Sequence, residues 1–91
     1  MGLSLSIARL RATLPTVTRH DLYCIAETNP DKIFMFLGDL VIDATEFIAS
    51  HPGGATAITK RHMCDITEDY KFHRSTGRQK ILEFATHRVV G

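Results

Sequence analysis

The sequence predicts an α+β domain in which short helices lie against a small mixed sheet. Two apolar runs of strand length, residues 33–37 and 40–42, are separated by Gly38 and Asp39 and favour a β-hairpin. Several short helical stretches follow in series, which places helices together on one side of the sheet. Helices of this length are not stable alone. We therefore expect an apolar cofactor to fill the space between them.

Length and composition limit the class of protein. The 91 residues allow one domain, and 44% hydrophobic with 23% charged residues is typical of a folded chain. A formal net charge of +1 gives no reason to expect a nucleic-acid partner, which needs a strongly basic surface. The charge is unevenly distributed, because Lys/Arg against Asp/Glu is four to six in residues 1–50 and seven to four in residues 51–91.

Residues 1–17 are expected to form an N-terminal arm ahead of a domain that spans residues 18–91. The arm contains Arg9 and Arg11, several Ser/Thr and no acidic residue, which suits either a short targeting segment or a partly ordered arm. Its first six residues match the loose pattern for N-myristoylation. No apolar run approaches the roughly 20 residues that span a bilayer. We expect a monomeric, cytoplasmic chain without a transmembrane segment, and peripheral membrane association through the N-terminus stays open.

The first helix of the domain has clear signals at both ends. Thr18 can accept a hydrogen bond as its N-cap, with Asp21 as a weaker member of a capping box. Residues 29–31, Asn-Pro-Asp, favour a turn that ends it. The sequence therefore predicts a helix between these two signals.

The second half of the chain is expected to contain several short helices and a short closing strand. Thr76 and Gln79 form a capping-box pattern, which predicts a helix with Ile81 and Leu82 on its apolar side. Residues 89–90 are expected to close the sheet. Earlier short helices are expected at residues 45–50, residues 55–61, and from Asp65 or Thr67 to Phe72.

Two of the five histidines have a context that suits a ligand. His51 begins His51-Pro52-Gly53-Gly54, in which the glycines carry no side chain and let a flat, bulky partner come close. His73 lies near an expected helix boundary. A single histidine is more often structural, so His20, His62 and His87 are interpreted as exposed or packed, and a role for His62 beside a cofactor is left open. Apolar side chains available to line a pocket are Phe47, Ile58, Tyr70, Phe72, Ile81 and Leu82.

Other site chemistries have weak support. Cys24 and Cys64 lack the spacing of a zinc site, and the absence of Cys-x-x-Cys-His means that any haem would be held non-covalently. Both thiols are expected to be buried or idle, and a disulfide between them is left open. No nucleophile elbow or pair of spaced carboxylates indicates an enzyme.

Several segments resemble the cytochrome b5 family. Residues 41–54, VIDATEFIASHPGG, are similar to its first haem-ligand segment, and residues 65–70, DITEDY, resemble the family's Asp-Ala-Thr-Glu-Asn-Phe. His73, with Gly77 four residues later, resembles the second ligand and the small residue that follows it. The resemblance extends from about residue 18 to residue 91. His51 and His73 are 22 positions apart, about two fewer than is usual in the family.

The resemblance implies a cytochrome b5-like fold with a b-type haem held between short helices. His51 and His73 would be the axial ligands, and the pocket would include Phe47, Gly53, Gly54, Ile58, Tyr70, Phe72, Gly77 and Ile81. It implies transfer of single electrons between a flavin-dependent reductase and an acceptor protein, not catalysis. The alternatives are a haem-binding module for regulation or transport, and a degenerate interaction domain without haem.

The resemblance also shows a difference in surface charge. The acidic rim typical of microsomal members is diluted here by the cations Lys60, Arg61, Lys71, Arg74 and Arg78. This argues against the usual reductase and cytochrome P450 partners, because opposite surface charge steers such encounters.

Overall fold

The hairpin expected in the middle of the chain forms the centre of the sheet. In the computed structural model, which describes residues 2–47, 60 and 62–90, β2 (Phe34–Leu37) pairs antiparallel with β3 (Leu40–Asp43). Gly38 has φ of +62° in the intervening turn, a conformation that glycine adopts without a steric cost. The break at Gly38-Asp39 is therefore the turn that the sequence predicts.

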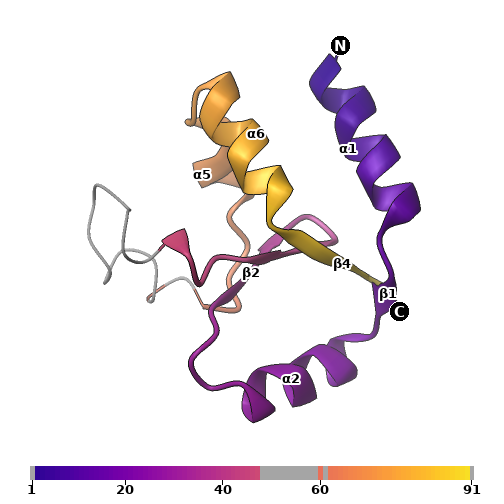
Figure 1. Cartoon of the computed structure of the whole chain (residues 1–91), viewed down its shortest axis with the longest axis vertical. Coiled ribbons are helices and arrows are strands. Elements are labelled where there is room, and N and C mark those ends of the chain that lie inside the picture. Colours follow the sequence, from indigo (N-terminus) through magenta and orange to yellow (C-terminus); the bar gives the residue numbers. More distant parts are fainter. Residues whose placement is uncertain (1, 48–59, 61, 91) are drawn as a thin grey trace.

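Two further strands complete a mixed sheet of order β1-β4-β3-β2 (Figure 1). β4 (Ala85–Val89) pairs antiparallel with β3, and β1 (Thr16–Val17) pairs parallel with β4. The expectation that residues 89–90 close the sheet is confirmed at Val89, which pairs with Val17, but the strand is longer than that pair. The strand begins earlier because pairing with β3 continues to its end, where the Asp43 N–H donates to the Phe84 carbonyl at 3.0 Å. The α+β class is confirmed.

The first domain helix has the expected ends. α2 (Arg19–Thr28) begins after Thr18, whose hydroxyl accepts the Asp21 N–H at 3.0 Å. At its other end the Asn29 side chain donates to the Ile25 carbonyl at 2.8 Å. Both contacts use backbone groups that a helix terminus leaves without intrahelical partners.

The helices after residue 66 follow the sequence less closely. α5 (Thr67–Lys71) begins where the Asp65 carboxylate accepts the Thr67 N–H at 2.7 Å. α6 (Ser75–Glu83) begins one residue before Thr76, with extended Arg74 as its N-cap and no side-chain capping bond. The capping box expected at Thr76 and Gln79 is therefore wrong, because Thr76 lies inside the first turn.

The alternation of strand side chains builds two core clusters. Leu22 on α2 and Val17 on β1 pack with Phe34, Phe36 and Val41. The other cluster joins the sheet to α5 and α6, and its buried members are Met35, Leu37, Leu40, Ile42, Ala44, Ile66, Tyr70, Ile81 and Leu82. Because successive strand residues point to opposite faces, these clusters lie on the two sides of the hairpin. Figure 1 accordingly shows α2 at one end of the molecule and α5 with α6 at the other.

The N-terminal segment is joined to the domain. α1 (Gly2–Thr13) leads into β1, and the Pro15 carbonyl accepts the Arg88 N–H at 2.9 Å. Arg11 forms an ion pair with Asp39 at 2.6 Å, and Leu10 and Leu14 pack against the cluster that contains Tyr70. None of the helices in the described residues is long and apolar enough to cross a membrane.

Some expectations fall on residues that are not described. The helix expected at 55–61 lies almost entirely outside the described residues, as does half of that at 45–50. Cys24 and Cys64 are described, and both are free thiols exposed to solvent, so the expectation of burial is wrong.

Candidate functional site

His73 lies in the turn between α5 and α6 with its side chain exposed. Its Nδ1 is 2.7 Å from the Asp69 carbonyl oxygen, four residues earlier. A carbonyl can only accept a hydrogen bond, so Nδ1 carries the proton and donates. The lone pair of a neutral ring is then on Nε2, for which no partner occurs among the described residues. This is the arrangement in which a histidine binds a metal, with its other nitrogen fixed by a carbonyl.

Gly77 lies directly beside the His73 ring. A Cβ built on Gly77 would be 3.4 Å from both Cβ and Cδ2 of His73. The glycine therefore leaves open, beside the imidazole, the space that a Cβ would fill in contact with the ring. The small residue expected four positions after the ligand has this physical role.

The aromatic residues near His73 differ sharply in exposure. Tyr70 is 6% exposed and belongs to the core between the sheet and α5–α6. Burial raises the pKa of its hydroxyl above the ordinary value, and the nearby Arg78 charge lowers the pKa by a smaller amount. Phe72 is 87% exposed, so it is not a core residue in this structure. The predicted pocket role of Phe72 stays a prediction.

Two other residues predicted to line the pocket pack with the core cluster that contains Tyr70. Ile81 is buried on α6, and Phe47 packs edge-on against Phe84 with ring centroids 4.7 Å apart. Four more residues of the predicted site, His51, Gly53, Gly54 and Ile58, lie outside the described residues. The structure therefore does not test the pairing of His51 with His73.

The remaining described histidines are arranged differently. His62 Nδ1 accepts the Phe34 N–H at 3.1 Å, so its lone pair is already used. His87 lies on β4 with its Nδ1 3.0 Å from the Thr86 hydroxyl, and His20 is exposed on α2 beside Cys24. In the described part of the chain, His73 alone combines a carbonyl-fixed Nδ1 with an exposed, unpartnered Nε2.

One pocket was not anticipated from the sequence. It has a volume of about 320 Å³ and contains the Lys32–Asp43 ion pair at 3.8 Å. Its other lining residues are Thr45, Glu46, Glu83, Phe84, Ala85 and Thr86. These come from three separate stretches of chain, residue 32, residues 43–46 and residues 83–86, which no single motif joins, so no sequence signal could have found the pocket.

The geometry at His73 agrees with the match to known families. The family model described as "Cytochrome b5-like Heme/Steroid binding domain" matches residues 13–86. The chain belongs to the cytochrome b5 family. Domains of this family bind b-type haem and serve electron transport, which confirms the expected cofactor and fold.

The curated relatives of this cytochrome b5 domain are much longer proteins. It is 38% identical over 60 residues to a nitrate reductase [NADPH] of Phytophthora infestans, a match that covers 65% of this chain. It is 32% identical over 66 residues to a nitrate reductase [NADH] of Lotus japonicus, covering 68% of this chain. In both cases the match spans only 7% of the relative's length.

Solved structures of cytochromes share the fold. Cytochrome b5 of Ostreococcus tauri virus 2 superposes with a TM-score of 0.54 at 31% identity, covering 65% of this chain and 78% of that chain. Cytochrome b558 of Ectothiorhodospira vacuolata, described as a prokaryotic homologue of cytochrome b5, gives 0.63 at 25% identity. That match covers 84% of this chain and 99% of the other.

The residues around His73 suit a b-type haem. An imidazole with a free Nε2 is a ligand of haem iron, and the exposed Phe72 offers a flat apolar surface next to it. The sequence motif predicts His73 as a ligand, but it could not identify the Asp69 carbonyl as the group that orients the ring. A backbone acceptor leaves no residue-type signal, because any amino acid at position 69 supplies the same carbonyl.

Proposed function

We propose that this cytochrome b5 domain carries single electrons on a b-type haem whose iron is bound by His51 and His73. The main support is the Nδ1 contact of His73 with the Asp69 carbonyl, which leaves Nε2 free as a ligand. When bound, haem supplies a one-electron couple between ferric and ferrous iron. Asp69 orients the imidazole through its carbonyl, and Gly77 leaves room beside the ring.

Two histidine ligands would exclude substrate from the iron. Such a site leaves no open position for a substrate or for oxygen, so its role is transfer and not catalysis. The match to a small part of two nitrate reductases supports a position between an electron donor and an acceptor. We propose a flavin-dependent reductase as donor and a redox protein or domain as acceptor.

Visible spectroscopy of the purified protein tests this function. The protein should be red, with sharp α and β bands after reduction, and the His51→Ala and His73→Ala variants should lose the low-spin spectrum. His62→Ala and His87→Ala are matched controls that should keep it, because neither ring has its Nδ1 fixed by a backbone carbonyl as His73 does. A colourless wild-type protein that stays colourless after addition of haem would refute the proposal.

Carbon monoxide distinguishes a second function. The family description covers both haem and steroid binding, and a ligand-responsive module needs an open or labile axial position. Reduced protein that keeps its low-spin bands under carbon monoxide supports the electron carrier. Ready carbon monoxide binding would instead favour regulation or transport.

A further inference from the structure

Two buried polar atoms on the α5–α6 side have no hydrogen-bond partner among the described residues. One is the hydroxyl oxygen of Tyr70, a residue that is only 6% exposed. The other is Nε of Arg78, a half-buried residue of α6. Buried polar groups almost always have a partner, because a buried donor without one destabilises the fold. These two atoms therefore indicate that a further group binds here.

The two atoms belong to neighbouring side chains and are both hydrogen-bond donors. Burial raises the pKa of Tyr70 and the Arg78 charge lowers it, so the guanidinium lies near the hydroxyl. The hydroxyl does not accept the Nε–H of Arg78, because each atom is without a partner. A phenol can donate its proton, and an arginine nitrogen can only donate. Two neighbouring donors are satisfied together when one group accepts from both.

The charge of Arg78 makes an anion the best acceptor. A guanidinium stays charged in proteins, and its hydrogen bonds are strongest with an ionised partner. Arg78 forms no ion pair with a carboxylate in the described part of the chain. A carboxylate has two oxygens, so it can accept a hydrogen bond from each of the two donors. The pair therefore fits a carboxylate that comes from outside the described residues.

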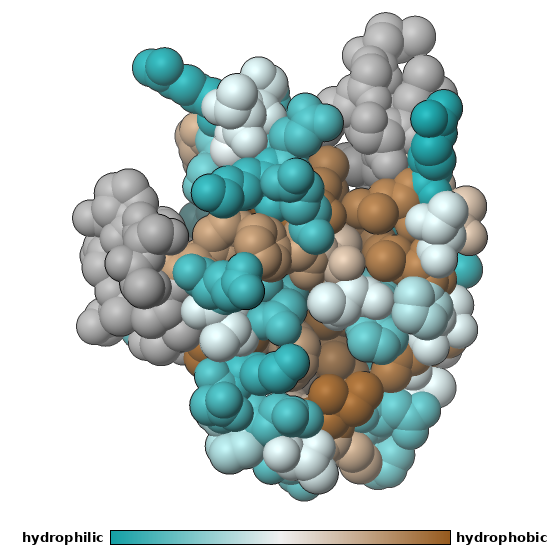
Figure 2. Space-filling view, in the orientation of Figure 1, coloured by the Kyte–Doolittle hydropathy of each residue, from teal (hydrophilic) through white to brown (hydrophobic). Residues whose placement is uncertain are grey.

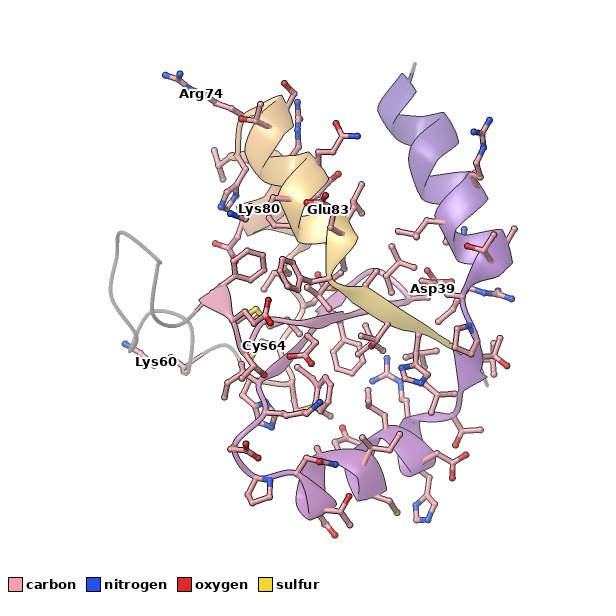
Figure 3. All side chains as sticks on the ribbon, viewed as in Figure 1. Asp39, Lys60, Cys64, Arg74, Lys80 and Glu83 are labelled. Carbon is pink, nitrogen blue, oxygen red and sulfur yellow. The ribbon has the colours of Figure 1, made fainter. Side chains whose placement is uncertain are left out.

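The other cations of α6 are placed differently. Arg74 and Lys80 are exposed, and Figure 3 shows Arg74 extending away from the outer end of the helix. Figure 2 shows hydrophilic side chains over this part of the surface. Water satisfies charges in such positions, so neither residue indicates a ligand. Arg78 differs because its Nε is buried.

Tyr70 and Arg78 are close in the chain to the proposed haem ligand. The Tyr70 carbonyl accepts the His73 N–H at 3.1 Å. Arg78 follows Gly77, which leaves open the space beside the His73 ring. A b-type haem carries carboxylates on its propionate side chains. The proposed function therefore brings groups of the required kind to the side of the domain that holds the two donors.

We infer that the Tyr70 hydroxyl and Arg78 Nε together form a carboxylate site, and that the proposed function makes a haem propionate its ligand. This inference rests on the proposed function, and it adds how the chain recognises the edge of the cofactor. The carboxylate accepts one hydrogen bond from each donor, and its charge offsets that of the guanidinium. Acetate presents the same group without a haem, so it serves as the probe for a free carboxylate.

Haem and its dimethyl ester test the site, because esterification removes only the charges of the propionates. The release of each cofactor from the reconstituted protein is measured by its transfer to apomyoglobin. The wild type should release the ester about tenfold faster than haem, because an uncharged acceptor bonds more weakly to arginine. Tyr70→Phe and Arg78→Met should each speed the release of haem about threefold and leave that of the ester nearly unchanged.

Two control variants separate the pair from general effects of charge and of tyrosine. Arg88→Met removes another buried Nε without a described partner, on β4. Tyr23→Phe removes a hydroxyl from a residue of α2 that is 49% exposed. Both variants should keep the wild-type ratio of ester release to haem release. An Arg88→Met effect as large as that of Arg78→Met would overturn the assignment.

Nuclear magnetic resonance of the wild type tests the site without a cofactor. In the isotope-labelled chain with no haem added, sodium acetate should shift the Nε–H signal of Arg78, and sodium chloride at equal ionic strength should not. A shift without any difference between haem and its ester would support the carboxylate site with a free carboxylate as its ligand. A difference between the two cofactors without a shift would support the haem propionate.

Failure of this inference and failure of the proposed function give different results. A low-spin haem protein that shows neither the difference in release nor the acetate shift would overturn the carboxylate site alone. A protein that binds no haem, but whose Arg78 signal shifts with acetate, would count against the proposed function alone.

Discussion

The helices on the two sides of the sheet differ in their capping and in the exposure of the segments beside them. On one side, α2 is capped at both ends and buries Leu22 to 1% exposure against Phe36 and Val41. On the other side, α5 and α6 are short, α6 lacks a side-chain N-cap, and the turn between them is exposed. The difference lies in the helix ends and not in the amount of core, because the larger buried cluster is on the α5–α6 side, where the exposed turn carries the proposed ligand His73.

The same contrast applies to the polar groups. Near α2, side chains satisfy backbone groups, as with Thr18 and Asn29. Near α5–α6, a backbone carbonyl satisfies a side chain, because Asp69 fixes the ring of His73. Near α2, side chains therefore stabilise the ends of a helix, whereas near α5–α6 the backbone orients the side chain of the proposed ligand.

The largest expected effect is in the α2 core. Leu22→Ala removes a side chain that is 1% exposed and should lower the free energy of unfolding by about 3 kcal/mol. Ile81→Ala, on α6, should lower stability and also speed haem loss. Urea unfolding of the apoprotein and haem transfer to apomyoglobin measure the two effects. Faster haem loss from Leu22→Ala than from Ile81→Ala would contradict the proposal that the haem site lies on the α5–α6 side.

Gly77 tests how much room the His73 ring needs beside α6. Gly77→Ala adds a Cβ at ordinary contact distance, 3.4 Å from His73, and should raise stability by up to about 1 kcal/mol through helix propensity. Gly77→Val adds branches beyond that contact and should cost about 2 kcal/mol through crowding. The visible spectrum should keep its low-spin form in the alanine variant and lose intensity in the valine variant. Identical spectra for both would show that the ring does not need the space left by Gly77.

The two helix starts offer a smaller test. Thr18→Ala removes the hydroxyl that accepts the Asp21 N–H and should cost about 1 kcal/mol. Arg74→Ser places a good N-cap at the start of α6 and should gain about 0.5 kcal/mol. Thermal unfolding of both variants, compared with Thr13→Ala at an exposed position, measures the change. A loss of stability in Arg74→Ser would mean that the arginine side chain, and not only its extended backbone, supports the start of α6.

Sequence reasoning was accurate where local signals decide the structure. Thr18 at the start of α2 and Gly38 in the hairpin act through contacts with near neighbours, so residue type alone predicts them. It failed at the start of α6, where extended Arg74 and not a capping side chain sets the boundary. It also missed most of β4, because Ala85 enters the sheet by pairing with Ile42, far away in the sequence.

At the candidate site, too, the sequence predicts some features and the structure alone supplies others. The motif predicts His73 as a ligand, and the structure adds the tautomer and the contact with Gly77, which depend on how α5 and α6 meet. Cys24 and Cys64 show the converse error, because thiols are usually buried and these two are exposed. Residue type gives the tendency, and only the three-dimensional surroundings give the outcome.

The smallest expected effect is a pH dependence in the α5–α6 core. Burial raises the pKa of Tyr70 above 10.0, and the Arg78 charge opposes this only in part. The folded protein therefore holds the phenol proton at a pH where the unfolded chain releases it, so stability falls as pH rises above about 10.

Tyr70→Phe should remove this loss of stability at high pH. At pH 7 it should change stability by less than about 1 kcal/mol, because the Tyr70 hydroxyl has no hydrogen-bond partner among the described residues. Urea unfolding between pH 8 and about 11, with the wild type and Tyr70→Phe compared at each pH, measures the difference. Parallel curves for the two proteins would show that Tyr70 does not contribute to the alkaline loss.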